Sequence, residues 1–330
     1  MNLFNIFILR TLRKIFHERR YVHEKKRMEG LVDFRRCQYL DQAGNDYIFQ
    51  RLLQYHGGGL MLSKWGTTEL NAVISYIFRN RSPYMYDYIN FIKGWYEIWG
   101  EGTSELFTLS GVFPNTLEMR DRFAQQALKD CGEIDILASY KEGERAILDK
   151  MPHTVNVNLD AFYAPFLWEN PWTQWLMGKR VLVVHPFIES IRKQYEQNRE
   201  KLFANPQVLP EFKELICVKA VQSLGGGDNV KFEDWFEALH YMKHEIDCHN
   251  YDVAIIGCGA YGMSLAAHVK RQGKVAIHLA GWTQMLFGVY GKRWMEHQTK
   301  YARFINEYWL KPSLEEKPRT AMKVEDGCYW

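Results

Sequence analysis

A glycine-rich turn between an apolar run and a segment with helical spacing constrains this chain more than any other feature. The apolar run covers residues 252–256 (DVAII), the turn 257–262 (GCGAYG), and the helical segment 263–272, which ends at Gly273. A second apolar run follows at 275–279. This order predicts a buried strand, a tight turn, a helix and a second parallel strand. The unpaired N–H groups and the positive dipole end at the start of such a helix favour an anionic ligand, most often a phosphate.

The turn also matches the G-x-G-x-x-G pattern of dinucleotide sites through Gly257, Gly259 and Gly262. An NAD site of this kind has an Asp or Glu about 20 residues further on, which binds the ribose hydroxyls. Residues 278–281 (HLAG) end the second apolar run without an acidic side chain. The sequence therefore favours a phosphate-bearing ligand other than NAD. An NAD-dependent oxidoreductase and a packing turn without ligand are the alternatives.

A second junction of the same kind lies closer to the N-terminus. Residues 60–64 (LMLSK) predict a strand and residues 70–78 a helix, with Thr67 or Thr68 as its N-cap. Glu69 falls in the first turn of this helix, where a carboxylate complements the helix dipole. Open α/β sheets bind ligands at the carboxyl ends of their strands, so Glu69 is also a candidate site residue.

Apolar runs alternate with helical segments through the rest of the chain. Further strands are predicted at 134–138, 155–157, 181–184 and 215–221. Because each strand from residue 180 onward is followed by a helix, the predicted fold class is α/β. We expect a Rossmann-like, open, mostly parallel sheet with helices on both faces.

The ends of these strands should bring further polar residues to the glycine turn. His185 and Gln222 each follow a predicted strand, and we expect Lys292 and Arg293 to be the nearest cations to the proposed phosphate site. His185 would act as a base or would only cap a neighbouring loop. The two cations would contact the phosphate or would be ordinary surface charges.

The first 27 residues differ from the rest of the chain. They contain eight Lys and Arg against two Glu, whereas the whole chain has a net charge of only +3. That bulk charge does not suggest a nucleic-acid partner. The apolar run at 3–9 is too short to span a bilayer, and the charges follow it, unlike those of a signal peptide. We consider two interpretations, an interfacial helix on an anionic membrane and a solvated basic helix. One face of the interfacial helix would carry Leu3, Ile6, Phe7, Leu12 and Phe16.

The sequence predicts a basic amphipathic extension (1–44), a single α/β domain (45–312) and a C-terminal tail (313–330). The six cysteines show no disulfide framework, which favours a reducing, cytoplasmic compartment. Two clusters have a functional and a structural interpretation. The three tryptophans of the first cluster either form a wall on which a ligand stacks or belong to the core (Trp168, Trp172, Trp175). The residues of the second cluster share one helix face, which either binds a metal ion or is solvated (His240, His244, Cys248).

Several stretches resemble a known group of proteins. They are GCGAYGMSLAAHVKRQGKVAIHLAGWTQMLFGVYGKRW at 257–294, HPF at 185–187, KAVQS at 219–223, DWFEAL at 234–239 and the terminal GCYW. From about residue 45, the chain is similar to uncharacterised bacterial proteins that occur among surface-polysaccharide genes. Those proteins resemble, more distantly, the GT-D type of glycosyltransferase.

The GT-D pattern places Arg-Phe-Gly-Asp-x-Glu after a strand, and residues 64–69 of this chain read Lys-Trp-Gly-Thr-Thr-Glu. Gly66 and Glu69 are kept, while Thr67 stands where the family has Asp. In the family the acidic pair is associated with the nucleotide-sugar and metal site. The resemblance implies a UDP-sugar-like donor and a glycan or lipid-linked acceptor, and a single carboxylate leaves a role for Mn²⁺ or Mg²⁺ open.

These considerations together predict a glycosyltransferase of surface-polysaccharide or glycan synthesis, working in the cytoplasm or at the inner face of the membrane. The alternative is a non-catalytic nucleotide-binding or partner-binding protein of a polysaccharide assembly. Glu69 and His185 are the candidate catalytic residues. The residues expected to bind the donor are Lys64, Gly66, Thr67, Thr68, Gln222, Gly257, Gly259, Tyr261, Gly262, Lys292 and Arg293.

Overall fold

The computed structural model describes residues 3–18, 37–94, 96, 104–224, 231–317, 320 and 327–329. These residues form an open seven-stranded sheet in which every neighbouring pair of strands is parallel. The strands are β1 (Leu60–Ser63), β2 (Ile136–Ser139), β3 (Val155–Asn158), β4 (Arg180–His185), β5 (Glu214–Lys219), β6 (Val253–Ile256) and β7 (Val275–His278). The expected Rossmann-like α/β class is confirmed, with a sheet that is wholly parallel.

Most of the apolar runs become strands that are buried on both faces of the sheet. Strands β1, β2, β6 and β7 are buried along their whole length, as continuous apolar runs in parallel sheets are. The side chains of β4 alternate between two cores: Leu182 and Val184 belong to one hydrophobic cluster, Val181 and Val183 to the other. The same alternation runs through the other central strands, so the two clusters are the two faces of the sheet.

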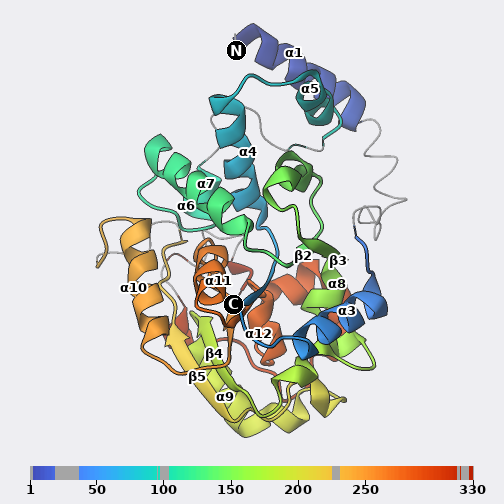
Figure 1. The fold of residues 1–330 in the computed structure, drawn as a ribbon, viewed down its shortest axis with the longest axis vertical. Coiled ribbons are helices and arrows are strands. Elements are labelled where there is room, and N and C mark those ends of the chain that lie inside the picture. The colour runs from blue at the N-terminus through green and yellow to red at the C-terminus, as the bar shows by residue number, and fades with distance from the viewer. Residues whose placement is uncertain are drawn as a thin grey trace.

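Helices cover both of these faces (Figure 1). The core of the first face includes residues of α4 (Thr67–Asn80), α7 (Leu117–Cys131), α10 (Trp235–Asp247) and α11 (Tyr261–Arg271). The core of the second includes residues of α3 (Asp41–Leu53), α8 (Leu159–Tyr163), α9 (Ile188–Asn198) and α12 (Trp282–Leu286). The expectation of helices on both faces is thus confirmed.

The strand order, β3-β2-β1-β7-β6-β4-β5, decides where a ligand can bind. The chain builds outward from β1 to β3, crosses to β4 and β5 at the other edge, and returns through β6 to β7 beside β1. Helix α9 follows β4 on one face, and α11 follows the neighbouring β6 on the other. Diverging helices leave a crevice at the carboxyl ends of the strands, which is the usual ligand site of an open α/β sheet.

The N-terminal segment is attached to the domain more closely than the sequence suggests. Helix α1 (Leu3–Arg13), continued by the π-helix η1 (Lys14–Glu18), packs against α5 (Met85–Ile92) and contributes Leu9 to the core. Helix α3 begins at Asp41, ahead of the expected domain start at residue 45, and Tyr39 already pairs with Val157 of β3. No helix among the described residues is both long enough and apolar enough to cross a membrane.

The C-terminal tail returns to the body at two places. Glu316 is buried, and its carboxylate accepts the N–H of Glu189 (2.8 Å) and the hydroxyl of Ser190 at the start of α9. This carboxylate complements the dipole of α9. Residues 327–329 then reach the carboxyl edge of the sheet, where Tyr329 lies against Gly281 and Gly291. The tail is part of the fold at both points.

Some local predictions are wrong in detail. Neither Thr67 nor Thr68 caps α4, because the N-cap is Gly66 and Thr67 is already the first helical residue. Helix α9 ends as an α-helix at Asn198 and continues as a short 3₁₀ turn. At α7 the N-cap is Thr116, whose hydroxyl accepts the N–H of Met119 (3.1 Å).

The burial of individual side chains bears on the two ambiguous clusters. Trp172 is wholly buried and stacks on Phe162, with ring centroids 6.0 Å apart, so this tryptophan is core. His240, His244 and Cys248 are all exposed on α10. Within the described residues, no group of three or more His, Cys, Asp or Glu side chains is arranged to hold a metal ion. The interpretation of the α10 cluster as a solvated face is therefore favoured.

Candidate functional site

A cavity of about 250 Å³ lies at the carboxyl edge of the sheet. Loops that follow β1, β2, β4, β5, β6 and β7 all contribute to its wall, together with the loop after α6 (Glu105–Thr108) and the C-terminal tail. The wall includes residues 64–69, Ser110, Tyr140, 185–187, 221–224, 257–261, His278, Gln284, Arg293 and Tyr329. The cavity thus occupies the crevice that the strand order creates.

Most of the site residues expected from the sequence meet at this cavity. It is lined by Lys64, Gly66, Thr67, Thr68, Glu69, His185, Gln222, Gly257, Gly259, Tyr261 and Arg293. Two expected residues are not among those that line it. Gly262 packs against the ring of His278, which leaves no space for a Cβ, so its role is close helix–strand packing. Lys292 is exposed to solvent, whereas its neighbour Arg293 is half-buried.

The junction between β1 and α4 presents charged and hydroxyl side chains. The carboxylate of Glu69 folds back over Gly66, where a Cβ would overlap it, so a side chain at this position would displace the carboxylate. The Thr68 hydroxyl donates to Oε2 of Glu69 (3.0 Å). Tyr140, which follows β2, donates its hydroxyl to the carbonyl of Trp65 (2.9 Å) and lies 3.4 Å from the Thr67 hydroxyl. Burial raises the pKa of Tyr140 to about 12, so its phenol keeps its proton.

Ser110 connects this junction to the glycine turn. Its hydroxyl shares a hydrogen bond with the Thr68 hydroxyl, and its carbonyl accepts the N–H of Ala260 (3.4 Å). Glu69 is therefore linked to the turn through two intervening residues, and both junctions belong to one site. The contact also means that one N–H of the turn already has a protein partner.

The glycine turn itself is tightly enclosed. Gly259 has φ +59°, a left-handed conformation that is unfavourable for residues with a Cβ. At Gly257 a Cβ would overlap the carbonyl of Ala280, and Thr283 would also be too close. The wall here is therefore backbone, and its shape depends on the absence of side chains at these two positions.

Tyr261 is held within the wall. Its hydroxyl lies 2.8 Å from the hydroxyl of Ser223, which donates to the carbonyl of Gly111 (2.6 Å). The single hydroxyl proton of Ser223 is thus committed, so Tyr261 is the donor in their bond. Its ring stacks on Trp235 with centroids 5.0 Å apart. Tyr261 fixes the loop after β5 against α11, which is a positioning role.

Both histidines at the cavity are neutral at physiological pH. Nδ1 of His185 accepts the N–H of Phe187 (3.0 Å), which assigns the ring proton to Nε2, and burial lowers the pKa of His185 to about 3. Nδ1 of His278 is 2.9 Å from the Ser63 hydroxyl. Burial, and secondarily the charge of Lys64, lowers the pKa of His278 to about 3. The loop-cap interpretation of His185 is favoured, because such a ring is a poor base near pH 7.

Lys64 and Arg293 bring positive charge to the cavity. The Arg293 guanidinium lies over the ring of Tyr329, 4.5 Å from its centroid. The backbone N–H of Arg293 donates to the backbone carbonyl of Cys328 (2.8 Å). The Lys64 ammonium is 5.6 Å from the ring centroid of Tyr140. The tail therefore orients the arginine, a role that no spacing in the sequence reveals.

The arrangement suits a ligand with phosphate and hydroxyl groups. Two cations and the free end of a helix can hold phosphate charge, and hydroxyl and amide side chains can bind a sugar. Glu69 is the single carboxylate among the lining residues, and Mg²⁺ in proteins is commonly held by one or two carboxylates plus substrate phosphates. Comparisons of this chain with protein-family models, with curated proteins and with solved structures find no match.

Proposed function

We propose that this chain is a glycosyltransferase that uses a nucleotide-sugar donor. The observation that carries the proposal is the meeting of both strand–turn–helix junctions in one cavity, with Lys64 and Arg293 on its wall and Glu69 as its one acid. A transferase of this type needs positive charge for a diphosphate leaving group and a base for the acceptor hydroxyl. The cavity offers both within one enclosed space.

Each of these groups has a role in the proposed reaction. The acceptor hydroxyl oxygen attacks the anomeric carbon of the donor sugar, and the bond from that carbon to the diphosphate oxygen breaks. The carboxylate of Glu69 takes the proton of the acceptor hydroxyl. The diphosphate leaves with the bonding electron pair, and its added charge is stabilised by Lys64, Arg293 and the N–H groups at the start of α11. Where a divalent cation is bound, Glu69 would hold it and the cation would share the diphosphate charge.

One observation favours a second candidate, a nucleotide-binding protein without turnover. Thr67 replaces the second acid of the GT-D pattern, so the wall has a single carboxylate. The Glu69 carboxylate also has a partner in Thr68, which a purely structural role in the first turn of α4 would explain. Such a protein would bind a nucleotide-sugar and release no product.

The two candidates separate in an assay for nucleoside diphosphate release. The protein is incubated with UDP-, GDP- and dTDP-sugars and a panel of glycan acceptors, with and without Mn²⁺ or Mg²⁺. A transferase releases the diphosphate with at least one pair and loses this activity in Glu69→Gln. Binding of a donor with no release under any condition would support the non-catalytic candidate.

A further inference from the structure

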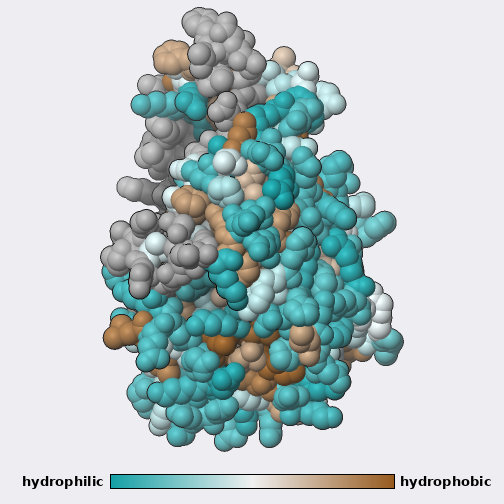
Figure 2. Space-filling view, turned by 90° about the vertical axis from the view of Figure 1, so that its left-hand side faces the viewer, coloured by the Kyte–Doolittle hydropathy of each residue, from teal (hydrophilic) through white to brown (hydrophobic). Residues whose placement is uncertain are grey.

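We propose that one end of this molecule, formed by α1, η1 and α5, binds the surface of an anionic phospholipid bilayer. The tip, as we name the described side chains of residues 7–16 together with residues 84–89, collects eight of the sixteen exposed large hydrophobic residues among those described. These eight are Phe7, Ile8, Ile15, Phe16, Tyr84, Met85, Tyr86 and Ile89. Figure 1 shows α1 and α5 together at the end of the molecule away from the sheet, and Figure 2 shows described apolar side chains at this end.

The exposure is large for apolar side chains on ordered helices. Met85 is 75% exposed, Phe7 69%, Phe16 61% and Tyr86 52%. Single exposed hydrophobic residues are normal on soluble proteins, whereas several together mark an interaction surface. The clustering of these side chains from two segments distant in the chain therefore indicates an interaction surface.

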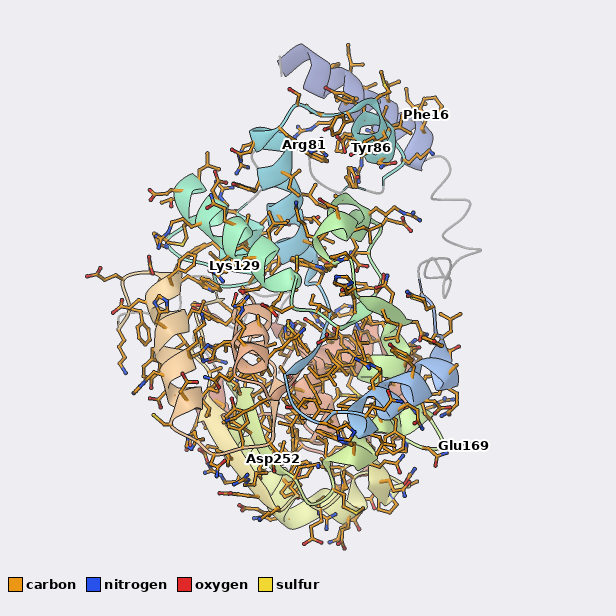
Figure 3. The ribbon with its side chains drawn as sticks, in the orientation of Figure 1. Phe16, Arg81, Tyr86, Lys129, Glu169 and Asp252 are labelled. Carbon is orange, nitrogen blue, oxygen red and sulfur yellow. The ribbon has the colours of Figure 1, made fainter. Side chains whose placement is uncertain are left out.

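Contacts within the tip hold the two segments together as one surface. Leu9 is buried, and Arg13 lies over the ring of Phe91, 4.8 Å from its centroid, while donating to the Phe91 carbonyl (3.3 Å) and to that of Tyr96. Figure 3 shows Phe16 and Tyr86 at this same end, beside Arg81. The face of α1 that packs inward carries Leu9 and Arg13, so Phe7 and Phe16 of the expected apolar face remain outside.

The charge of the tip identifies its partner as anionic. Arg10 and Lys14 are exposed on the outer side of α1 and η1. Asp87 is the one acidic residue of residues 81–94, and it is buried and paired with Arg81 (2.6 Å). The outer surface described for α5 and its N-terminal loop therefore offers no carboxylate. Exposed apolar side chains beside two exposed cations match a membrane whose headgroups are anionic and whose interior is apolar.

A bilayer fits this surface better than a second copy of the chain does. Two copies joined through the tip would bring together two surfaces that carry the same exposed cations, Arg10 and Lys14, since a two-fold interface uses the same patch of both copies. Tyr84 and Tyr86 stack with ring centroids 5.4 Å apart, and tyrosine is enriched where membranes meet water. The inference concerns location only and is independent of the reaction proposed above.

The test is co-sedimentation of the full chain with vesicles. We expect binding to phosphatidylcholine vesicles that contain phosphatidylglycerol and little binding to phosphatidylcholine alone. Raising the salt from about 0.1 M to about 1 M, which shortens the Debye length from about 10 Å to about 3 Å, should release the protein. Equal binding to both vesicle types, or no binding to either, overturns the proposal whatever the variants do.

Paired variants locate the surface. Phe7→Asp with Phe16→Asp, and separately Met85→Asp with Tyr86→Asp, should each weaken vesicle binding at least about tenfold. Arg10→Gln with Lys14→Gln should weaken it about 25-fold, since each cation near an anionic surface contributes about fivefold. Matched controls are Met177→Asp and Leu314→Asp, which alter residues 59% and 87% exposed outside the tip and should bind normally.

Two results would contradict the assignment of the tip. Unchanged vesicle binding by the tip variants, with the wild-type far-ultraviolet circular dichroism spectrum retained, would place any membrane contact elsewhere. A dimer that the tip variants abolish in analytical ultracentrifugation, with no vesicle binding by the wild type, would assign the tip to a second copy.

Discussion

The two strand–turn–helix junctions of this protein share a plan and differ in what they offer a ligand. After β1, residues 64–69 present an ammonium, two hydroxyls and a carboxylate to the cavity. After β6, residues 257–261 present mainly backbone, enclosed by Ala280, Thr283 and Ser110. The glycine turn is the clearer motif in the sequence, yet most of the chemically reactive groups stand at the other junction.

This difference follows from how each turn is packed. At the glycine turn, Gly257 and Gly262 allow close approach of neighbouring groups, and Tyr261 is held by Ser223 and Trp235. At the β1 junction, Gly66 makes space for the carboxylate of its own helix, Glu69. A glycine can therefore bring in a neighbouring backbone or a functional side chain, and a motif alone does not say which.

The largest effect should come from the β1 junction. Replacing Glu69 by Gln keeps size and hydrogen-bonding capacity and removes the base, so turnover should fall roughly 100-fold or more, with donor affinity little changed. The matched control is Glu118→Gln, which removes an exposed acid from the first turn of α7 and should leave turnover unaltered. Steady-state release of nucleoside diphosphate measures both. Normal turnover in Glu69→Gln would mean that this carboxylate is not the base and only complements the dipole of α4.

Substitution in the glycine turn should lower the stability of the fold. A methyl group at Gly257 would meet the Ala280 carbonyl and Thr283, so Gly257→Ala should cost about 1–3 kcal/mol of unfolding free energy and distort the cavity. Gly132→Ala is the control, because its φ is −63° and its nearest neighbours would be 3.5 Å away, an ordinary contact. Urea unfolding compares the two. Equal stability of Gly257→Ala and the wild type would mean that the turn is looser than this packing indicates.

Adjacent cations provide a third comparison. Arg293 lines the cavity and Lys292 is exposed outside it, so Arg293→Gln should weaken nucleotide-sugar binding about tenfold while Lys292→Gln should not change it. Fluorescence titration of each variant with the donor that the wild type binds measures the ratio. Equal losses from both substitutions would indicate a general electrostatic effect rather than a contact.

The smallest effect concerns pH. The pKa values of His185 and His278 are lowered to about 3, so acidifying from about pH 8 to about pH 5 protonates neither ring. Neither histidine should therefore produce a step in the pH–rate profile near pH 6.5. The His185→Gln and His278→Gln variants should show the same profile as the wild type in this range. Such a step, present in the wild type and absent from one variant, would show that the ring titrates in the working enzyme and that the cavity is wetter than its burial indicates.

Much of the fold was predictable because the strands are short apolar runs with clear ends. All seven predicted runs are strands, within two residues at each end. The strand order was not predictable, because it depends on which crossover each helix makes. The Thr67 or Thr68 cap was expected wrongly because Gly66 takes the cap position, where glycine is about as favourable as threonine.

The site was predicted where residues follow strands and missed where they come from distant loops. Lys64, Glu69, His185 and Gln222 stand at strand ends, and all line the cavity. Tyr140 also follows a strand and could have been found by the same rule. Ser110 and Tyr329 could not, because one lies in a loop between helices and the other near the end of the tail. Their places depend on tertiary packing that no local pattern encodes.

Calorimetric titration of the wild type with UDP-, GDP- and dTDP-sugars, with and without Mn²⁺ or Mg²⁺, tests the central claim most directly. Glu69→Gln and Arg293→Gln are titrated in parallel. We predict that one nucleotide-sugar binds the wild type, that Glu69→Gln binds it with similar affinity, and that Arg293→Gln binds it more weakly. The absence of binding by any of these donors under every condition would contradict a nucleotide-sugar site in this cavity.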